Sequence, residues 1–383
     1  MSRTPWDEER VARAALAAVH DPGGPELDDP PEAGGASQRW AELRSADTAL
    51  GRRARALDPG RLVSQCEELG ARFIMPGDPE WPTKLEAVAG CDRSLHQGLG
   101  GVPLGLWARG PLGLAEACDA AVAVVGARAA TSYGQDVAIE MAHDLARPGG
   151  RRGSQQCWTV VSGGAYGIDV AAHRGALTAG GRTICVQAGG LDELYPRGNG
   201  AVLARILEEG LLVSESAPGR RPTRPGFLAR NRVIAGLTDG VVIVEAAARS
   251  GALSTANWAG DMYREVLAVP GPVTSSRSVG PHDLIRNRRA ELVRDADDVR
   301  EALGPIQPEL PREPVPEHPT DALGPETLRV HEALPARGAL GVDELSRAAL
   351  VSLTDCLLAL QELEDRGMAS YGADGRWSVR LRR

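Results

Sequence analysis

The chain has 383 residues, of which 43% are hydrophobic, and it carries a formal net charge of −8. This length predicts two or three domains, and the apolar fraction is ordinary for domains that build a core. No apolar run approaches the roughly 20 residues that span a bilayer, so we expect no membrane segment. Residues 1–7 are polar and lack the apolar core of a signal peptide, which favours a cytoplasmic location.

The sequence contains no motif for a metal or a common cofactor. Its six cysteines are scattered without a CxxC pair, which is typical of reduced thiols and not of a zinc site. Neither a GxGxxG fingerprint nor a GxxxxGK[ST] loop occurs, and Lys84 is the only lysine. We therefore expect no metal and no NAD, FAD or ATP as cofactor.

Residues 1–75 are predicted to form a helical N-terminal region. Residues 6–19 and 61–69 have the apolar spacing of amphipathic helices. Residues 21–35 lie between them and are rich in Pro, Gly and Asp, which predicts a mobile loop.

Short apolar runs alternate with helical patterns over residues 76–303. Strands are expected at residues 120–125, 159–162, 182–188, 211–215, 240–245 and 266–269. Helices are expected at residues 131–146, 168–179, 199–209, 227–237 and 254–264. This alternation predicts an α/β fold with a mostly parallel sheet that is covered on both faces. Ligands of such sheets bind at the carboxyl ends of the strands, where the loops 126–128, 162–169, 188–195 and 245–255 should meet.

The loop at residues 162–169 reads S-G-G-A-Y-G-I-D and joins a strand to a helix. Glycines at 163, 164 and 167 allow positive φ angles and let a ligand approach the backbone. The amides that begin the following helix favour an anion. We therefore predict phosphate contact, whether the phosphate belongs to a nucleotide, a cofactor or a nucleic acid. The predicted contacts are Ser162, Gly163, Gly164, Tyr166 and Gly167.

A second segment, residues 216–238, contains five arginines and no carboxylate. Phe227, one of only two phenylalanines in the chain, lies among these arginines. Arginine beside a planar aromatic is typical of phosphate contact with base stacking. A solvated basic loop that leads into a core helix explains the same residues equally well. The arginines are Arg220, Arg221, Arg224, Arg230 and Arg232.

Several polar residues near these loops allow either a catalytic or a structural role. Asp169 and His173 are spaced i, i+4 and could form an acid/base pair, but we favour a bond from Asp169 to helix amides. Glu245 ends a strand, and we favour a structural role in which it holds an arginine or the next helix. We expect Thr255, which lies near the same loops, to have a structural role as well. No nucleophile is evident, so we expect no enzyme.

The end of the chain is predicted to form a separate module. Residues 304–324 hold six prolines, a seventh follows at Pro325, and this composition predicts a semi-rigid linker. Residues 325–383 show three short helical patterns and a ribbon, which favours a winged-helix domain. The third helical pattern, residues 353–366, carries four carboxylates that would repel a phosphate backbone, so docking of a protein is as plausible there as DNA contact.

Together the motifs resemble DNA-processing protein A, the DprA/Smf family, over residues 76–303. In order they are Gly126-Ala127-Arg128, the glycine loop, A-G-G-L-D-E-L-Y-P-R-G-N, F-L-A-R-N-R-V-I-A-G-L, R-S-G-A-L-S-T-A and V-P-G-P. The resemblance implies an extended Rossmann fold behind a SAM-like N-terminal region. It also implies a dimer that binds single-stranded DNA, protects incoming DNA and loads the RecA recombinase during natural transformation and homologous recombination. Single-strand-binding protein is a further expected partner, and no catalytic activity is implied.

The resemblance also assigns DNA contacts residue by residue. They are Gly126, Arg128, Arg224, Phe227, Arg230, Asn231, Arg232, Arg249, Ser250 and Gly251. The chain departs from the family pattern at Tyr166, where many members have lysine, and at Ala127 and Leu228. Residues 211–213 and 241–244 are candidates for the dimer surface. The alternative function is a nucleotide-processing phosphoribohydrolase on a related fold, although its P-G-G-x-G-T-x-x-E loop is absent.

Overall fold

In a computed structural model of the chain, the described residues are 5–25, 34–147, 156–304, 320, 323–336 and 338–380. The chain divides into two compact units, Met1–Ile306 and Gln307–Arg383. Most of the predicted linker and part of the predicted loop at residues 21–35 lie outside the described residues. Among the described residues, no helix combines the length and apolar character needed to span a bilayer.

The first unit is built on a nine-stranded sheet in the order β1-β2-β6-β5-β4-β3-β7-β8-β9. The strands β6, β5, β4, β3, β7, β8 and β9 are parallel to one another. At one edge of the sheet, β1 pairs antiparallel with β2, and β2 pairs antiparallel with β6. The predicted mostly parallel α/β sheet is confirmed. The strands are β1 Arg72–Ile74, β2 Leu106–Arg109, β3 Ala121–Val125, β4 Thr159–Ser162, β5 Thr183–Gln187, β6 Leu211–Ser214, β7 Gly240–Ile243, β8 Glu265–Ala268 and β9 Glu291–Leu292.

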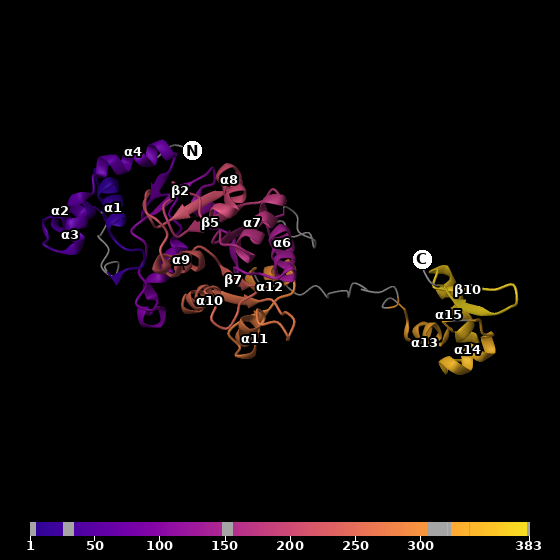
Figure 1. The fold of residues 1–383 in the computed structure, drawn as a ribbon. Helices are drawn as coiled ribbons and strands as arrows, with labels where there is room; N and C mark the ends of the chain where they lie inside the picture. The colour runs from indigo at the N-terminus through magenta and orange to yellow at the C-terminus, as the bar shows by residue number, and fades with distance from the viewer. Residues whose placement is uncertain are drawn as a thin grey trace. The chain divides into compact units, whose positions relative to one another are not determined.

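Helices cover both faces of this sheet, as Figure 1 shows. The α-helices are α1 Glu8–Val19, α2 Ala36–Ser45, α3 Ala49–Ala56, α4 Pro59–Leu69, α5 Leu114–Cys118, α6 Ser132–Ala146, α7 Ile168–Thr178, α8 Gly200–Glu209, α9 Arg224–Gly236, α10 Ala252–Asp261, α11 Val279–Arg286 and α12 Ala296–Leu303. Short 3-10 helices are η2 Thr83–Gly90, η3 Arg93–His96 and η4 Arg197–Asn199.

The continuous apolar strands follow from this double cover, because successive strand residues point to opposite faces. In β3, Val122 and Val124 pack with α6, α7 and α12. Ala121, Ala123 and Val125 pack on the other face with α9 and α10. The dimer surfaces expected at residues 211–213 and 241–244 are wrong, because these residues are fully buried inside the sheet.

The N-terminal helices belong to the same compact unit as the sheet. Leu16 and Val19 of α1 share a core cluster with Phe73 and Trp107 of the antiparallel strands. Helices α1 and α4 match the predicted helices, while α2 and α3 were not predicted. Both helices are polar on average and bury few side chains, so few apolar residues mark them in the sequence.

The second unit contains three helices and a two-stranded antiparallel ribbon, drawn in orange to yellow in Figure 1. The elements are α13 Pro325–Ala333, α14 Val342–Ala349, α15 Leu353–Asp365, β10 Ala369–Tyr371 and β11 Trp377–Val379. Val330, Leu345, Leu360 and Trp377 lie in its own core, which is separate from that of the first unit. These elements match the expected pattern, and their winged-helix identity stays a prediction.

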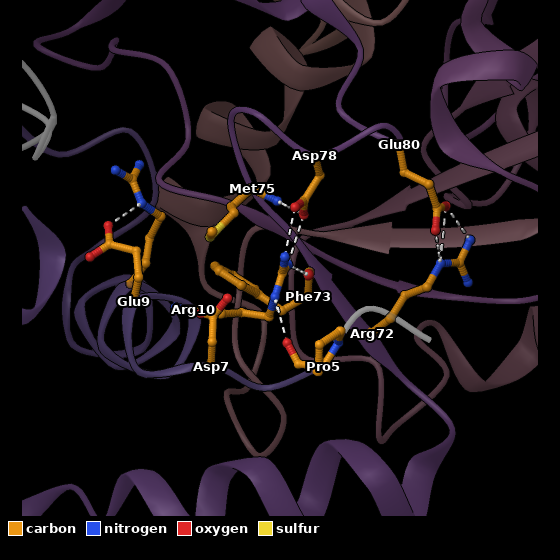
Figure 2. Close-up of polar contacts among 10 residues, drawn as sticks. Pro5, Asp7, Glu9, Arg10, Arg72, Phe73, Met75, Asp78 and Glu80 are labelled. Atoms are coloured by element: carbon orange, nitrogen blue, oxygen red, sulfur yellow. Dashed lines mark hydrogen bonds and ion pairs between the residues drawn. The ribbon is translucent and has the colours of Figure 1, made fainter. Parts of the chain in front are cut away.

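A buried ion pair fastens α1 to the strand end of β1 (Figure 2). The guanidinium of Arg10 donates to both carboxylate oxygens of Asp78 at 2.7 and 2.6 Å and to the carbonyl of Phe73 at 2.8 Å. Asp78 also accepts the backbone N–H of Met75 at 2.9 Å. The hydrogen bond to Asp78 raises the pKa of Arg10, and burial opposes that rise.

We predict that Asp78→Ala lowers the free energy of unfolding by about 3 kcal/mol or more, because it leaves a buried guanidinium without its counter-charge. Urea denaturation followed by tryptophan fluorescence measures the change. The control is Glu116→Ala, which breaks the exposed pair with Arg182 and should cost less than about 1 kcal/mol. Equal losses in the two variants would contradict the proposed role of the Arg10–Asp78 pair.

Candidate functional site

The loops that leave the carboxyl ends of neighbouring strands are bonded to one another. The N–H of Ala127, after β3, donates to the carbonyl of Glu245, after β7, at 2.7 Å. The N–H of Ile168, after β4, donates to the carbonyl of Ala127 at 3.2 Å. These bonds bring together three of the four loops that were expected to meet, those at 126–128, 162–169 and 245–255.

A cleft of about 1260 Å³ opens above these loops. Five arginines and a single carboxylate, Asp169, are among the residues that line it. Such a lining concentrates positive charge in one place on a chain whose net charge is −8. The arrangement suits an anionic ligand that extends over several contacts. The arginines are Arg128, Arg224, Arg230, Arg249 and Arg277.

Arg230, on α9, reaches from the helix to the ends of two strands. Its Nη1 donates to the carbonyl of Gly163 at 2.6 Å and to the carbonyl of Val186 at 2.8 Å. The residue is 7% exposed, and burial lowers the pKa of its guanidinium. An arginine remains charged at neutral pH even after such a shift. Arg230 is thus a fixed positive charge at the floor of the cleft.

Asp169 lies beside this charge at the start of α7. Burial raises the pKa of its carboxyl group, and the positive charge of Arg230 opposes the rise. The carboxylate accepts N–H groups of Ala165 and Gly126, which ties the glycine loop to the loop after β3. Its placement agrees with the favoured structural role, in which it bonds backbone amides.

Aromatic and cationic side chains meet on the rim of the cleft. The guanidinium carbon of Arg128 lies 4.8 Å from the ring centroid of Phe227, which is a cation–π arrangement. Phe227 also contacts Tyr195, with ring centroids 5.9 Å apart and a tilt of 48°. Tyr195 is 43% exposed and lies outside the lining itself, so aromatic surface adjoins the cleft next to Phe227.

The loop 249–251 forms the opposite side of the cleft. Asn231 of α9 holds it through a hydrogen bond from its Nδ2 to the carbonyl of Gly251 at 3.2 Å. Glu245 begins the same connection but turns away, because its carboxylate accepts the N–H of Thr131 at 2.9 Å and the hydroxyl of Thr131 at 2.6 Å. Glu245 therefore has a structural role, but it holds the start of the earlier helix α6 and not the arginine or next helix that was expected.

Eleven of the residues predicted for the site line the cleft, and the remaining predicted residues do not. Those in the lining are Gly126, Arg128, Asp169, Arg224, Phe227, Arg230, Asn231, Arg249, Ser250, Gly251 and Thr255. Those outside it are Ser162, Gly163, Gly164, Tyr166, Gly167, Arg232 and Glu245.

The glycines of the loop at residues 162–169 pack against protein, which does not support the expected phosphate cradle. A Cβ on Gly163 would lie 1.7 Å from Nη1 of Arg230. A Cβ on Gly167, whose φ is +78°, would lie 2.2 Å from the carbonyl oxygen of Ala127. The glycines are needed so that Arg230 and the neighbouring loop can approach closely. Ser162 is also occupied, because its buried hydroxyl donates to the carbonyl of Val124 at 2.7 Å.

Three further residues that the sequence suggested as DNA contacts do not line the cleft. Arg232 is fully buried and pairs with Glu215 at 2.6 Å, so it is not available to DNA in this structure. Arg220 donates to the carbonyl of His20 and to Asp21 in the N-terminal region. Tyr166 is half exposed and lies against Gly198, outside the lining of the cleft.

Sequence reasoning missed Arg277 and Gln97, which also line the cleft. Arg277 follows β8, and its backbone carbonyl accepts the N–H of Ala246 at 2.7 Å. The rule that ligands bind at carboxyl ends of parallel strands applies to β8 as well, so it would have identified Arg277. Gln97 follows η3, outside the alternating strands and helices, and carries no such signal.

The geometry does not support the less favoured alternative, an acid/base pair of Asp169 and His173. His173 is fully buried, and its Nδ1 lies 2.8 Å from the hydroxyl of Thr183, which itself donates to the carbonyl of Val160. The imidazole must therefore donate from Nδ1, and its Nε2 is buried without a partner among the described residues. Burial lowers the pKa of His173 to about 3 from an ordinary value of 6.5.

This lowered pKa predicts a loss of stability in acid. The contribution of His173 is fully present above pH 6.5 and is lost as the pH falls toward 3, because only the unfolded chain then takes up the proton. The loss should approach about 1.4 kcal/mol per pH unit within that window. We expect His173→Gln to flatten the decline of the melting temperature between pH 6.5 and pH 4. An unchanged decline would show that His173 is not the titrating group.

Comparisons with known proteins agree with this fold and cleft. The model of the family described as DNA recombination-mediator protein A matches residues 72–304. A DNA processing protein DprA of Mycobacterium tuberculosis is 46% identical over 310 residues, which cover 81% of this chain and 77% of that protein. DprA of Streptococcus pneumoniae is 41% identical over 178 residues, which cover 46% of this chain and 60% of that protein.

A solved structure gives the same assignment. The X-ray structure of DNA processing protein A from Streptococcus pneumoniae matches with a TM-score of 0.61 and 28% sequence identity, and the match covers 78% of this chain and 99% of that chain. The family model and the M. tuberculosis relative together span both the sheet and the loops of the cleft. This chain therefore belongs to the DNA recombination-mediator protein A family, DprA/Smf.

Proposed function

We propose that the protein binds single-stranded DNA along the arginine-lined cleft and acts as a recombination mediator. The observation that supports this most is the lining itself, in which five arginines stand beside one carboxylate and an aromatic rim. Arginines neutralise successive phosphates, while Phe227 and Tyr195 offer surfaces for base stacking. The two kinds of contact together fit a nucleotide chain.

A single strand fits this rim better than a duplex. The faces of bases in a duplex are covered by their neighbours, whereas the bases of a single strand can stack on aromatic side chains. Phe227 contacts both Arg128 and Tyr195, so one nucleotide can place its base on a ring and its phosphate on the guanidinium. Binding of this kind has little dependence on sequence and a strong dependence on salt.

The geometry gives less support to a nucleotide-processing enzyme. Glu245, the carboxylate at the end of β7, is 2% exposed and is engaged by Thr131. His173 is buried away from the cleft lining, and Asp169 is bonded to backbone amides. We propose a binding protein without catalytic activity.

Membership of a recombination-mediator family supports the rest of the proposal. The protein would act in the cytoplasm as a homodimer, protect incoming single strands and load RecA onto them during natural transformation or homologous recombination. Single-strand-binding protein, which coats the same strands, would be a further partner. The C-terminal unit would be a winged-helix module whose acidic α15 suits a protein partner better than DNA.

We predict that Arg128→Ala weakens binding of single-stranded DNA about tenfold at low salt, because it removes a phosphate contact and the cation above Phe227. The slope of log affinity against log salt should fall by about 0.7. Fluorescence anisotropy with single-stranded and duplex oligonucleotides measures both effects. The control is Arg182→Ala. Arg182 is exposed, pairs with Glu116 and directly precedes β5, so it lies at the amino end of that strand, away from the cleft. No preference for single strands, or equal behaviour of the two variants, would refute the proposal.

We also predict that the wild-type protein speeds RecA-dependent strand exchange on single strands coated with single-strand-binding protein. Arg128→Ala should reduce this stimulation in proportion to its loss of DNA affinity, because the mediator must first reach the coated strand. Stimulation that survives in a variant unable to bind DNA would show that the mediator role does not depend on the cleft.

A further inference from the structure

A second cavity of about 550 Å³ continues from the arginine-lined cleft. Leu228, Arg249, Ser250 and Gly251 line both spaces, so the two are contiguous across the loop 249–251. Helices α10 and α11 and the end of η3 form the rest of its wall. A strand that follows the arginines can therefore pass directly into this second cavity.

The wall of the second cavity differs chemically from that of the cleft. It presents the carboxylate of Asp283 and three side-chain amides beside only two arginines. The amides belong to Asn257, Asn287 and Gln97, of which Gln97 also lines the cleft, and the arginines are Arg249 and Arg289. One of the amides is oriented, since Oδ1 of Asn257 accepts from Arg289 at 2.8 Å. The cavity thus has two arginines beside three amides and one carboxylate, whereas the cleft has five arginines beside one carboxylate. Amides and a carboxylate match the edges of nucleobases and not phosphate groups.

The inner side of the cavity is flat and rigid. His96 stacks on Trp258 with ring centroids 3.4 Å apart and an angle of 9° between the planes. Nε2 of His96 lies 2.6 Å from a carboxylate oxygen of Asp261, which fixes the imidazole. Both rings are buried, and they support the polar wall from behind. A rigid wall of this kind limits the entropy lost when a planar ligand is bound.

We propose that this second cavity is a nucleobase subsite of the same DNA-binding track and that Asp283 sets its preference. The inference rests on the proposed binding of single-stranded DNA in the cleft. An ionised carboxylate only accepts hydrogen bonds, so Asp283 favours a base that presents an amino group. Cytosine has an amino group where thymine has a carbonyl oxygen, and a strand of cytosines binds more tightly than a strand of thymines.

Asp283 distinguishes a base subsite from a continuation of the phosphate track. If phosphates occupied the cavity, the carboxylate would repel them, and its removal would strengthen binding to any strand. If a base occupies the cavity, removal of the carboxylate weakens binding of cytosine and leaves an amide that can donate to thymine. The two cases therefore predict opposite effects of Asp283→Asn on the cytosine strand.

The experiment uses the full chain and measures anisotropy with oligo-dC and oligo-dT of equal length, about 16 nucleotides. The wild-type protein should bind oligo-dC about fivefold more tightly than oligo-dT. Asp283→Asn should abolish or invert this ratio and leave the salt slope unchanged. The matched control is Glu265→Gln, an exposed carboxylate at the amino end of β8, which should keep the wild-type ratio.

The outcomes separate this inference from the proposed function. Equal gains for both strands in Asp283→Asn, or an unchanged ratio, overturn the base subsite while DNA binding itself stands. Absence of binding to either strand by the wild-type protein overturns the proposed function together with the subsite. Competition by free deoxycytidine monophosphate as strong as that by the strand would assign the cavity to a free nucleotide and would also overturn the inference.

Discussion

The buried guanidinium of Arg230 is the interaction on which the rest of the cleft depends. It joins α9 to the carboxyl ends of β4 and β5 through the carbonyls of Gly163 and Val186. Because a buried charge is costly without such partners, the two bonds favour this position of α9 over the sheet. Phe227 and Asn231 on the same helix are then placed on the rim and against the loop 249–251. Only glycine at 163 leaves room for this contact.

Support for α9 also comes from the side away from the cleft. Arg232 is buried against Glu215 and donates from Nε to the carbonyl of Gly100 at 3.3 Å. A buried ion pair adds little net stability, but breaking one partner is costly, so such a pair favours one arrangement over others. Adjacent arginines of one motif thus have different roles, since Arg230 borders the cleft and Arg232 holds the helix from behind.

The charge distribution explains how an acidic chain can present a site for an anionic polymer. Most carboxylates near the cleft are engaged, as Glu245 is by Thr131 and Asp169 is by backbone amides. The arginines therefore face the cleft with little compensation, and walls of low dielectric constant strengthen their field. In the contiguous cavity, amides and Asp283 stand beside Arg249 and Arg289, so the share of groups that can bond a base edge is larger there than in the cleft.

The sequence by itself determined the parallel sheet, the edge at which its loops meet and the family, because apolar alternation and motif order are local properties of the chain. Tertiary structure decided which residues of those motifs reach the cleft. The sequence does not show whether a glycine or an arginine faces a ligand or another loop. Only long-range packing places Arg230 at the cleft and buries Arg232 away from it. The same holds for the loop at residues 162–169. Its sequence suggests a phosphate-binding loop, whereas in the folded chain Gly163 makes room for the guanidinium of Arg230. Arg277, Gln97 and the second cavity depend on contacts between segments far apart in the chain, which no local pattern records.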